Sequence, residues 1–276
     1  MKIDKEFFEY TVSSATEASG KVFQFIQGEI DSATDEAREL LGEDLYAELS
    51  GQLFDDEPNA RIAKGVKKWI CLRAYEVAIP HRDLVLTPTG FGIVSNQNTS
   101  PASAERVNRL LQTVKNAKED QFDNILEMLR GNEKWCNTPQ ATFLFSSLFY
   151  RARQLSRYGV ADAHRSQLVA HRPRIKAAER RIKDAISPEF YQELCDAVRT
   201  NSVTSWQQSA ITSCMNVIGC EIDNSPRESR LHCKLLIGYL ADNLNEYPTY
   251  ANSSAYKANN FKSYENAVND SCYFFG

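Results

Sequence analysis

The side chains in this sequence that could carry out catalysis or bind a metal are few. It has four histidines: His81, His164, His171 and His232. His164 and His171 are seven residues apart, which is too far for the paired zinc ligands of an HExxH helix. Asp162 precedes His164 closely, but no serine lies in an elbow motif that would complete a hydrolase triad. We therefore expect no metal site and no catalytic residues.

Nucleotide-binding and cysteine motifs are missing as well. The sequence has no Walker A motif and no GxGxxG, and TGFG at residues 89–92 lacks the GK[ST] of a phosphate loop. The seven cysteines form no CxxC pair, so they fit neither a disulfide framework nor a zinc site. We expect no enzyme activity and no cofactor, with most cysteines being small core residues.

Charged residues are distributed unevenly along the chain. Residues 1–53 contain 12 acidic and 4 basic side chains, whereas residues 151–183 contain 10 basic and 2 acidic ones. At a spacing of 145 residues, four acidic positions align with four basic ones: Glu29, Asp31, Asp35 and Glu36 with Arg174, Lys176, Arg180 and Arg181. Three interpretations stay open: solvated helix faces, complementary faces that meet within or between chains, or nucleic acid on the basic segment.

These positions belong to a larger internal similarity. EYTVSSA at residues 9–15 is echoed by RYGVADA at 157–163, and LLGEDLYAEL at 40–49 is echoed by AISPEFYQEL at 185–194. Together, and in the same order, these matches predict a duplicated helical unit. The second copy is shorter where the first contains a β pattern.

The expected fold is mainly α, with two tandem related helical-bundle units, one inserted β-hairpin and an extended C-terminal arm. Unit one would span 1–135, the linker and unit two 136–246, and the arm 247–276. Apolar residues at helical spacing predict helices near residues 43–53, 59–79, 101–130, 188–198 and 226–245. The apolar stretch TFLFSSLFY at 142–150 fits a buried helix or a strand equally well.

The β-hairpin is expected at residues 83–96, DLVLTPTGFGIVSN. Glycines in its middle allow the positive φ that a tight reversal needs. A two-stranded hairpin alone is marginal in water, so it must pack on its own domain or pair with another subunit. We favour an intersubunit role for its apolar residues: Leu84, Leu86, Phe91 and Ile93.

The C-terminal stretch is rich in tyrosine and asparagine and ends in CYFFG. Three consecutive aromatic residues would be poor choices for a free end, because aromatic side chains bury large areas at interfaces. We predict an arm that is anchored on a surface by Tyr273, Phe274 and Phe275.

Composition limits the remaining classes. Charged residues make up 25% and hydrophobic residues 42% of the 276 residues, as in soluble globular proteins. The net charge of −4 argues against general nucleic-acid binding. The N-terminal MKIDKEFFEY lacks the apolar region of a signal peptide, and the longest apolar run, Leu235–Ala241, is too short to cross a bilayer.

The phrases GEDLYAEL and DLVLTPTGFGIVSNQNTSPAS and the Tyr/Asn-rich tail ending in YFFG resemble a family of phage and prophage proteins from Bacteroidetes. That family in turn resembles the helical head–tail connector, or adaptor, proteins of tailed phages. The resemblance implies a virion protein, assembled in the host cytoplasm, with no enzyme activity and no cofactor.

The resemblance also implies a set of partners. These are a homo-oligomeric ring of about a dozen copies, the portal protein, and the tail or further neck proteins. Contact with passing DNA would be non-specific, and no membrane contact is expected. Two other classes stay open: a cellular helical-repeat module that binds a protein or peptide, and a nucleic-acid-binding protein that uses residues 151–183.

Overall fold

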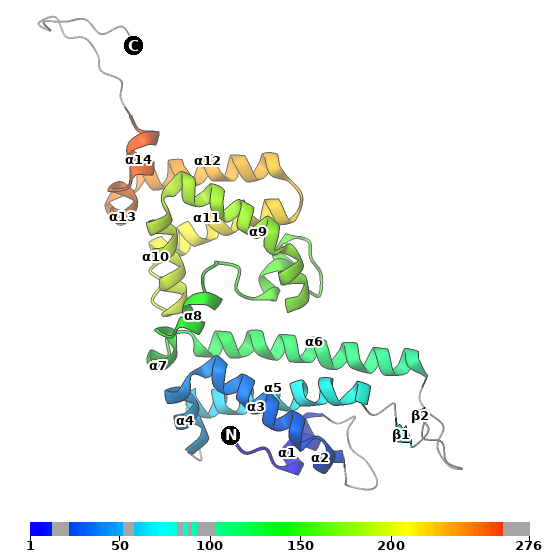
Figure 1. The fold of residues 1–276 in the computed structure, drawn as a ribbon. Helices are drawn as coiled ribbons and strands as arrows, with labels where there is room; N and C mark the ends of the chain where they lie inside the picture. The colour runs from blue at the N-terminus through cyan, green and yellow to red at the C-terminus, as the bar shows by residue number, and fades with distance from the viewer. Residues whose placement is uncertain (13–21, 52–57, 82–84, 88–89, 93–102, 262–276) are drawn as a thin grey trace, which may run out of the picture. The chain divides into compact units, whose positions relative to one another are not determined.

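The computed structural model of the chain is mainly α-helical (Figure 1). It describes residues 1–12, 22–51, 58–81, 85–87, 90–92 and 103–261. Contacts divide the chain into two compact units. Unit one contains residues 1–145, 150–170 and 199–201, and unit two contains residues 146–149 and 171–198 and the described residues after 201.

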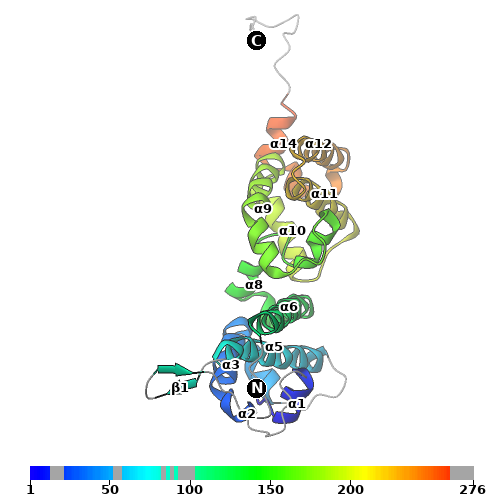
Figure 2. The ribbon, with the colours of Figure 1, turned by 90° about the vertical axis from the view of Figure 1, so that its right-hand side faces the viewer.

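Unit one is built around one long helix, α5. Its elements are α1 (Lys5–Thr11), α2 (Val22–Phe25), α3 (Gln27–Leu41), α4 (Glu43–Gly51), α5 (Pro58–His81), α6 (Ala104–Leu129), α7 (Glu133–Cys136), α8 (Pro139–Leu144) and the 3-10 helix η2 (Ala152–Tyr158). Helix α5 packs against both α3 and α6 (Figure 2). At Gly65 of α5 an added Cβ would lie 2.6 Å from Met128 Cε of α6, so the small residue permits this close approach.

A strand pair lies between α5 and α6 in the sequence. Strands β1 (Val85–Thr87) and β2 (Gly90–Gly92) are antiparallel, with Val85 opposite Gly92 and Thr87 opposite Gly90. The strands lie inside the predicted range 83–96 and occupy three residues each. Leu84 and Ile93 lie outside the described residues.

Unit two is built around an antiparallel helix pair. Its elements are α9 (Arg165–Ile186), whose first residues belong to unit one, α10 (Pro188–Arg199), α11 (Ser205–Ile222), α12 (Pro226–Asp242), η3 (Leu244–Glu246), α13 (Pro248–Ala251) and α14 (Ser254–Asn259). Helices α11 and α12 pack against each other. Helix α10 buries an apolar face that includes Phe190, Tyr191 and Leu194.

Two predicted borders need correction. The start of the segment expected as an arm at 247–276 belongs to unit two, because Tyr247 and Tyr250 are buried and their rings lie 5.6 and 6.1 Å from that of Phe190. The border expected after residue 135 falls inside unit one, because Trp135 is fully buried and its indole donates to Leu40 O at 2.8 Å. Aromatic burial thus ties both segments to their units.

The stretch 142–150 forms neither a continuous helix nor a strand. Helix α8 ends at Leu144, and irregular backbone follows up to residue 151. Side chains satisfy part of this backbone, since Ser147 Oγ accepts from Phe149 N at 3.0 Å and Gln154 Oε1 accepts from Tyr150 N at 2.9 Å. Such local side-chain bonds compete with regular secondary structure.

Both units contain the same helix–helix corner, 145 residues apart. Gly42 separates α3 from α4 with φ 76°, and Ser187 separates α9 from α10 with φ 93°. In each corner the N–H of this residue donates to the carbonyl four residues earlier, at 2.9 Å for Gly42 and 3.0 Å for Ser187. Residues with positive φ, glycine above all, are common directly after the last turn of a helix.

The corners also share their aromatic packing. Tyr46 and Tyr191, each four residues after the left-handed residue, are buried. Arg38 lies 4.8 Å from the ring centre of Tyr46, and Lys183 lies 4.9 Å from that of Tyr191. The apolar positions around both corners are buried in pairs: Ile30 and Ile175, Ala33 and Ala178, Leu41 and Ile186, Leu45 and Phe190, and Leu49 and Leu194.

Candidate interaction surfaces

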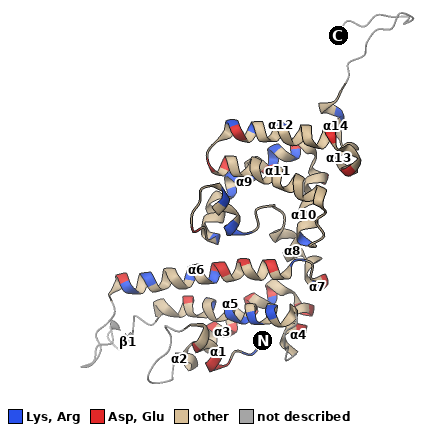
Figure 3. Cartoon of the chain, turned by 180° about the vertical axis from the view of Figure 1, so that it is seen from behind, with Lys and Arg blue, Asp and Glu red and all other residues tan. Residues whose placement is uncertain are grey.

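The acidic residues predicted as an interface lie on α3 (Figure 3). Some of them are exposed and others are engaged. Glu36 is held by Arg73 of α5, whose Nε and Nη2 atoms lie 3.0 and 2.9 Å from its two carboxylate oxygens. Glu29 is half-buried. Three acidic side chains at four-residue spacing stay exposed, and we name them the acidic stripe: Asp31, Asp35 and Glu39. Asp35 also forms an exposed ion pair with Arg38 of the same helix, at 3.4 Å.

The basic residues predicted as an interface lie on α9 and divide in the same way. Arg181 donates to Glu221 Oε1 at 2.5 Å and to Ser229 Oγ at 2.9 Å. Arg174 donates to Ile222 O at 3.0 Å. Three basic side chains at four-residue spacing form no ion pair within the described residues, and we name them the basic stripe: the half-buried Arg172 and the exposed Lys176 and Arg180.

The aligned acidic and basic positions therefore fall into two groups, those paired within their own unit and those that are exposed. Glu36 and Arg181 occupy equivalent positions, and each binds a neighbouring helix of its own unit. Hydrogen bonds from Arg181 and Ser229 outweigh the effect of burial and lower the pKa of Glu221, as expected for a carboxylate beside a guanidinium. The acidic stripe and the basic stripe contain the exposed positions, which another molecule can reach. Glu39 and Arg172 were missed in the sequence, although the four-residue spacing indicates them.

A groove runs beside the acidic stripe, between α3 and α5. It has a volume of about 470 Å³ and is lined by Gly28, Glu29, Ser32, Ala33, Glu36, Arg73 and Val77. An added Cβ at Gly28 would meet no atom within 4 Å, so the floor is open at this point. The groove places polar and apolar surface next to exposed carboxylates.

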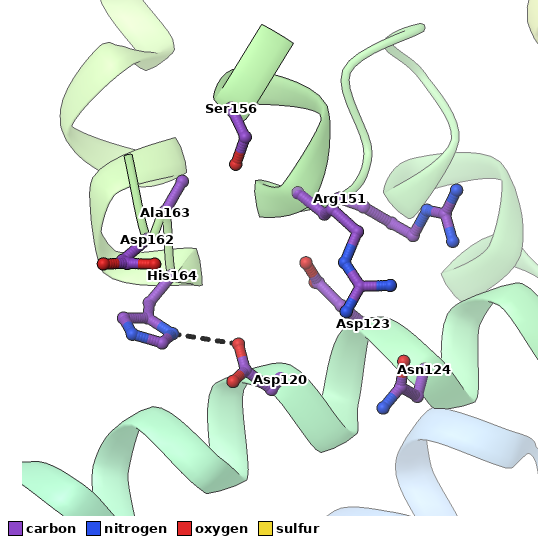
Figure 4. Close-up of a pocket in the computed structure, with 9 residues that line it drawn as sticks. Asp120, Asp123, Asn124, Arg151, Ser156, Asp162, Ala163 and His164 are labelled. Carbon is purple, nitrogen blue, oxygen red and sulfur yellow. Dashed lines mark hydrogen bonds and ion pairs between the residues drawn. The ribbon is translucent and has the colours of Figure 1, made fainter. Parts of the chain in front are cut away.

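A second hollow, of about 300 Å³, lies in unit one between α6 and residues 151–164 (Figure 4). Asp120 Oδ1 lies 2.9 Å from His164 Nδ1 at its edge. Ser156 also lines the hollow, across from the imidazole. No hydrogen bond joins Ser156 to His164 in the described part of the chain, so the nucleophile–base contact of a hydrolase is missing.

Carboxylates of α6 in this region accept hydrogen bonds from the backbone of residues 150–166. Glu119 accepts from Ser166 N at 2.8 Å and so caps the start of α9. Asp123 accepts from Ala152 N at 2.5 Å and from Arg165 Nη1 at 2.9 Å. Burial raises the pKa of Asp123 despite this pairing. The contacts indicate a structural support, and the sequence interpretation missed it.

Most of the described cysteines are buried, and Cys220 is half-exposed. Burial raises the pKa of Cys71 and of Cys195 to about 12, and buried thiols of this kind are inert. Within the described residues, no group of three or more His, Cys, Asp or Glu side chains could hold a metal ion. Among the same residues, no helix is long and apolar enough to span a membrane.

The remaining predicted interface residues lie in or beyond the strand pair and the C-terminal stretch. Leu86 and Phe91 are register partners in the strand pair. Leu84, Ile93 and the three aromatic residues of the tail lie outside the described residues: Tyr273, Phe274 and Phe275. Their roles stay predictions.

Comparison with known protein families finds a similarity in unit one. Residues 33–143 are similar to a family of unknown function, DUF6712. The matched stretch begins in α3 and ends in α8, so it covers most of unit one, including the acidic stripe residues Asp35 and Glu39. No curated protein and no solved structure matches the chain.

Proposed function

We propose that the chain is a structural virion protein, a head–tail connector or neck-ring subunit that docks on a phage portal and joins capsid to tail. The proposal takes up the family resemblance and rests on one structural observation. Oppositely charged, exposed stripes occupy equivalent helices of two related units. A subunit with two different, complementary patches can associate head to tail.

The stripes correspond to each other at two of their three positions, since Glu39 aligns with Asp184 and Arg172 with Gln27. Asp31, Asp35 and Glu39 lie on one face of α3 because residues four apart on a helix are neighbours. Lys176 and Arg180 lie on the equivalent face of α9, at the positions that correspond to Asp31 and Asp35. Each exposed pair contributes only about 0–1 kcal/mol. The stripes would therefore act as groups, through registry and encounter rate.

Duplication explains how one chain acquires two such patches. The two corners share their left-handed residue, their buried tyrosine and their buried apolar pairs. We interpret the units as copies of one helical unit. Opposite charging of the equivalent face then creates a head and a tail within one subunit, which gives a ring when the rotation between neighbours closes.

The strand pair and the C-terminal aromatic residues complete the proposal. Unit two has helices α9 to α12 in the order of α3 to α6 without strands between α11 and α12, so the helical unit does not need a hairpin to form. We assign the hairpin to contact between subunits. We likewise assign the aromatic residues of the tail to a contact that forms in the assembled oligomer.

Charge reversal tests this function. We expect Asp31→Lys, Asp35→Lys and Glu39→Lys together to weaken self-association at low salt by about tenfold or more, because attraction becomes repulsion along the stripe. Sedimentation velocity measures the association. A control with the same net charge change reverses exposed acidic residues at helix ends of unit two: Asp223, Asp242 and Glu246. Lysines there suit the helix dipole, so the control should assemble normally.

A complementary variant sharpens the test. Changing the basic stripe to glutamate should also block assembly, and mixing the two stripe variants should restore it as alternating oligomers. Normal assembly by either stripe variant alone would show that the stripes do not meet between subunits. Glu36 and Arg181 are left unchanged because each binds within its own unit.

The groove beside α3 favours a second candidate function, an interaction module that binds a peptide or protein. A groove of about 470 Å³ that includes Val77 and Arg73 offers apolar surface and charge for one side chain or a short segment. A stable monomer that captures a basic peptide on this face would favour the module over the ring.

A further inference from the structure

The hollow between α6 and residues 151–164 of unit one has polar walls, and we name it the α6 hollow. Its volume of about 300 Å³ lies at the lower end of the range for ligand pockets. Eight of the nine residues that line it have a polar or charged side chain, and the exception is Ala163 (Figure 4). A hollow of this size and lining fits a small charged ligand.

The positive side chains of the lining come from η2 and from the residue before it. Arg151 pairs through Nη1 with Glu127 Oε2 at 3.0 Å, but its Nε is buried and no atom of the described residues accepts a hydrogen bond from it. A buried donor without an acceptor is costly and uncommon in native proteins. Arg153 is exposed and forms no ion pair within the described residues. These two side chains offer donors to an anionic group.

The negative side chains reach the hollow from another direction. Asp162 and His164 lie on the side away from Arg151 (Figure 4), and Asp120 Oδ1 lies 2.9 Å from His164 Nδ1. Asp162 is exposed, and its carboxylate has no hydrogen bond or ion pair in the part of the chain that the structure describes. This side of the hollow offers an acceptor to a cationic group.

Most charged groups of the lining already have a partner within unit one. The pairs are Arg151 with Glu127, Asp123 with Arg165, and Asp120 with His164. Two lining charges are left, and they are opposite in sign: Arg153 and Asp162. A simple anion or a simple cation would therefore meet a like charge, whereas a ligand that carries both charges finds a partner for each.

We infer that the α6 hollow binds a small zwitterion with one ammonium group and one carboxylate, of the size of a free amino acid. The carboxylate accepts from Arg153 and from Nε of Arg151, and the ammonium donates to Asp162. Hydrogen bonds between ionised groups are the strong ones. Ser156 and Asn124 supply neutral partners at the same lining. This binding concerns unit one alone and does not depend on ring formation.

Ligand-observed NMR by saturation transfer tests the binding on the full-length protein. The probes are L-alanine, β-alanine and γ-aminobutyrate, which carry the same two charges at increasing separation. The matched analogues without the ammonium are propionate and butyrate, and those without the carboxylate are ethylamine and propylamine. We expect at least one zwitterion to bind, and its two analogues to bind at least about tenfold more weakly. No binding by any zwitterion, or equally tight binding by the analogues, would overturn the inference.

Two single substitutions locate the site. Arg153→Gln and Asp162→Asn each remove an unpaired charge, and asparagine tolerates the φ of 47° at residue 162. Each should weaken binding of the zwitterion at least about tenfold. The controls are Arg157→Gln in η2 and Asp44→Asn in α4, which change exposed residues outside the lining and should leave binding unchanged. Equal weakening by lining and control variants would place the ligand elsewhere and overturn the inference.

The selectivity of the two variants separates pairing from a general effect on shape. Asp162→Asn should no longer discriminate against the analogue without the ammonium, but should still discriminate against the one without the carboxylate. Arg153→Gln should show the opposite pattern. Loss of both selectivities in either variant would show that these side chains shape the hollow without pairing with the two charges, and it would overturn the assignment.

Discussion

At the scale of single residues, the carboxylates of α6 decide how the backbone after α8 is arranged. Glu119 caps α9, and Asp123 joins the start of η2 to Arg165. Asp123 is only 10% exposed in its side chain. Buried donors left without an acceptor cost more than an exposed ion pair contributes, so neighbouring carboxylates on one helix should differ sharply in importance.

We predict that Asp123→Ala destabilises the protein by about 3 kcal/mol, because it removes the carboxylate partner of the Arg165 guanidinium and the acceptor of the Ala152 N–H. Asp120→Ala is the matched control three residues earlier. Its carboxylate is 56% exposed, so its loss should cost less than about 1 kcal/mol. Urea unfolding of both variants measures the difference. Equal costs would mean that Asp123 is not the support described here.

At the scale of elements, local periodicity predicted the long helices well. The helices expected near 43–53, 101–130 and 188–198 appear as α4, α6 and α10. Their apolar faces and end residues lie within each segment, so a window of sequence contains the information. The repeat predicted from short matches also corresponds to the two corners at Gly42 and Ser187.

Features that depend on distant partners could not be predicted in this way. Residues 150–166 take their form from α6, up to 47 residues earlier in the chain. The engagement of Glu36 by Arg73, across 37 residues, likewise has no local signal. Charge alone could therefore not separate the exposed stripes from the paired side chains of the candidate interface.

The strand pair gives the element-scale prediction. Replacing Leu84–Val94 by a short Gly-Ser bridge should leave helical circular dichroism and the melting temperature nearly unchanged while abolishing self-association. The reason is that unit two has α11 and α12 joined without such strands. A Thr89→Ala variant of the intact hairpin should assemble normally. If the bridged variant unfolds, the hairpin is part of the core. If it assembles, the hairpin is not an intersubunit element.

At the scale of the whole molecule, the chain carries a charge asymmetry that its net charge conceals. The overall charge is −4, yet the acidic stripe belongs to unit one and the basic stripe to unit two. Such a molecule should attract its own kind at low salt, because opposite patches steer encounter. It should not behave as a general nucleic-acid binder, which needs a basic surface overall.

The dependence of assembly on salt should therefore distinguish the three function classes in one series. We expect closed oligomers of many copies at low salt, assembling more slowly as salt rises from about 0.05 M to about 0.5 M, because the Debye length shrinks to a few ångström. Mass photometry and negative-stain microscopy measure size and closure in the same samples. A monomer at every salt concentration would favour a peptide-binding module that uses the groove beside α3. Tight binding of duplex DNA, with an affinity that falls steeply with salt, would favour the basic segment as a phosphate-binding surface. Rings that form equally fast at every salt concentration would show that the protein assembles without help from the two stripes. The strand pair would then be the first contact to test.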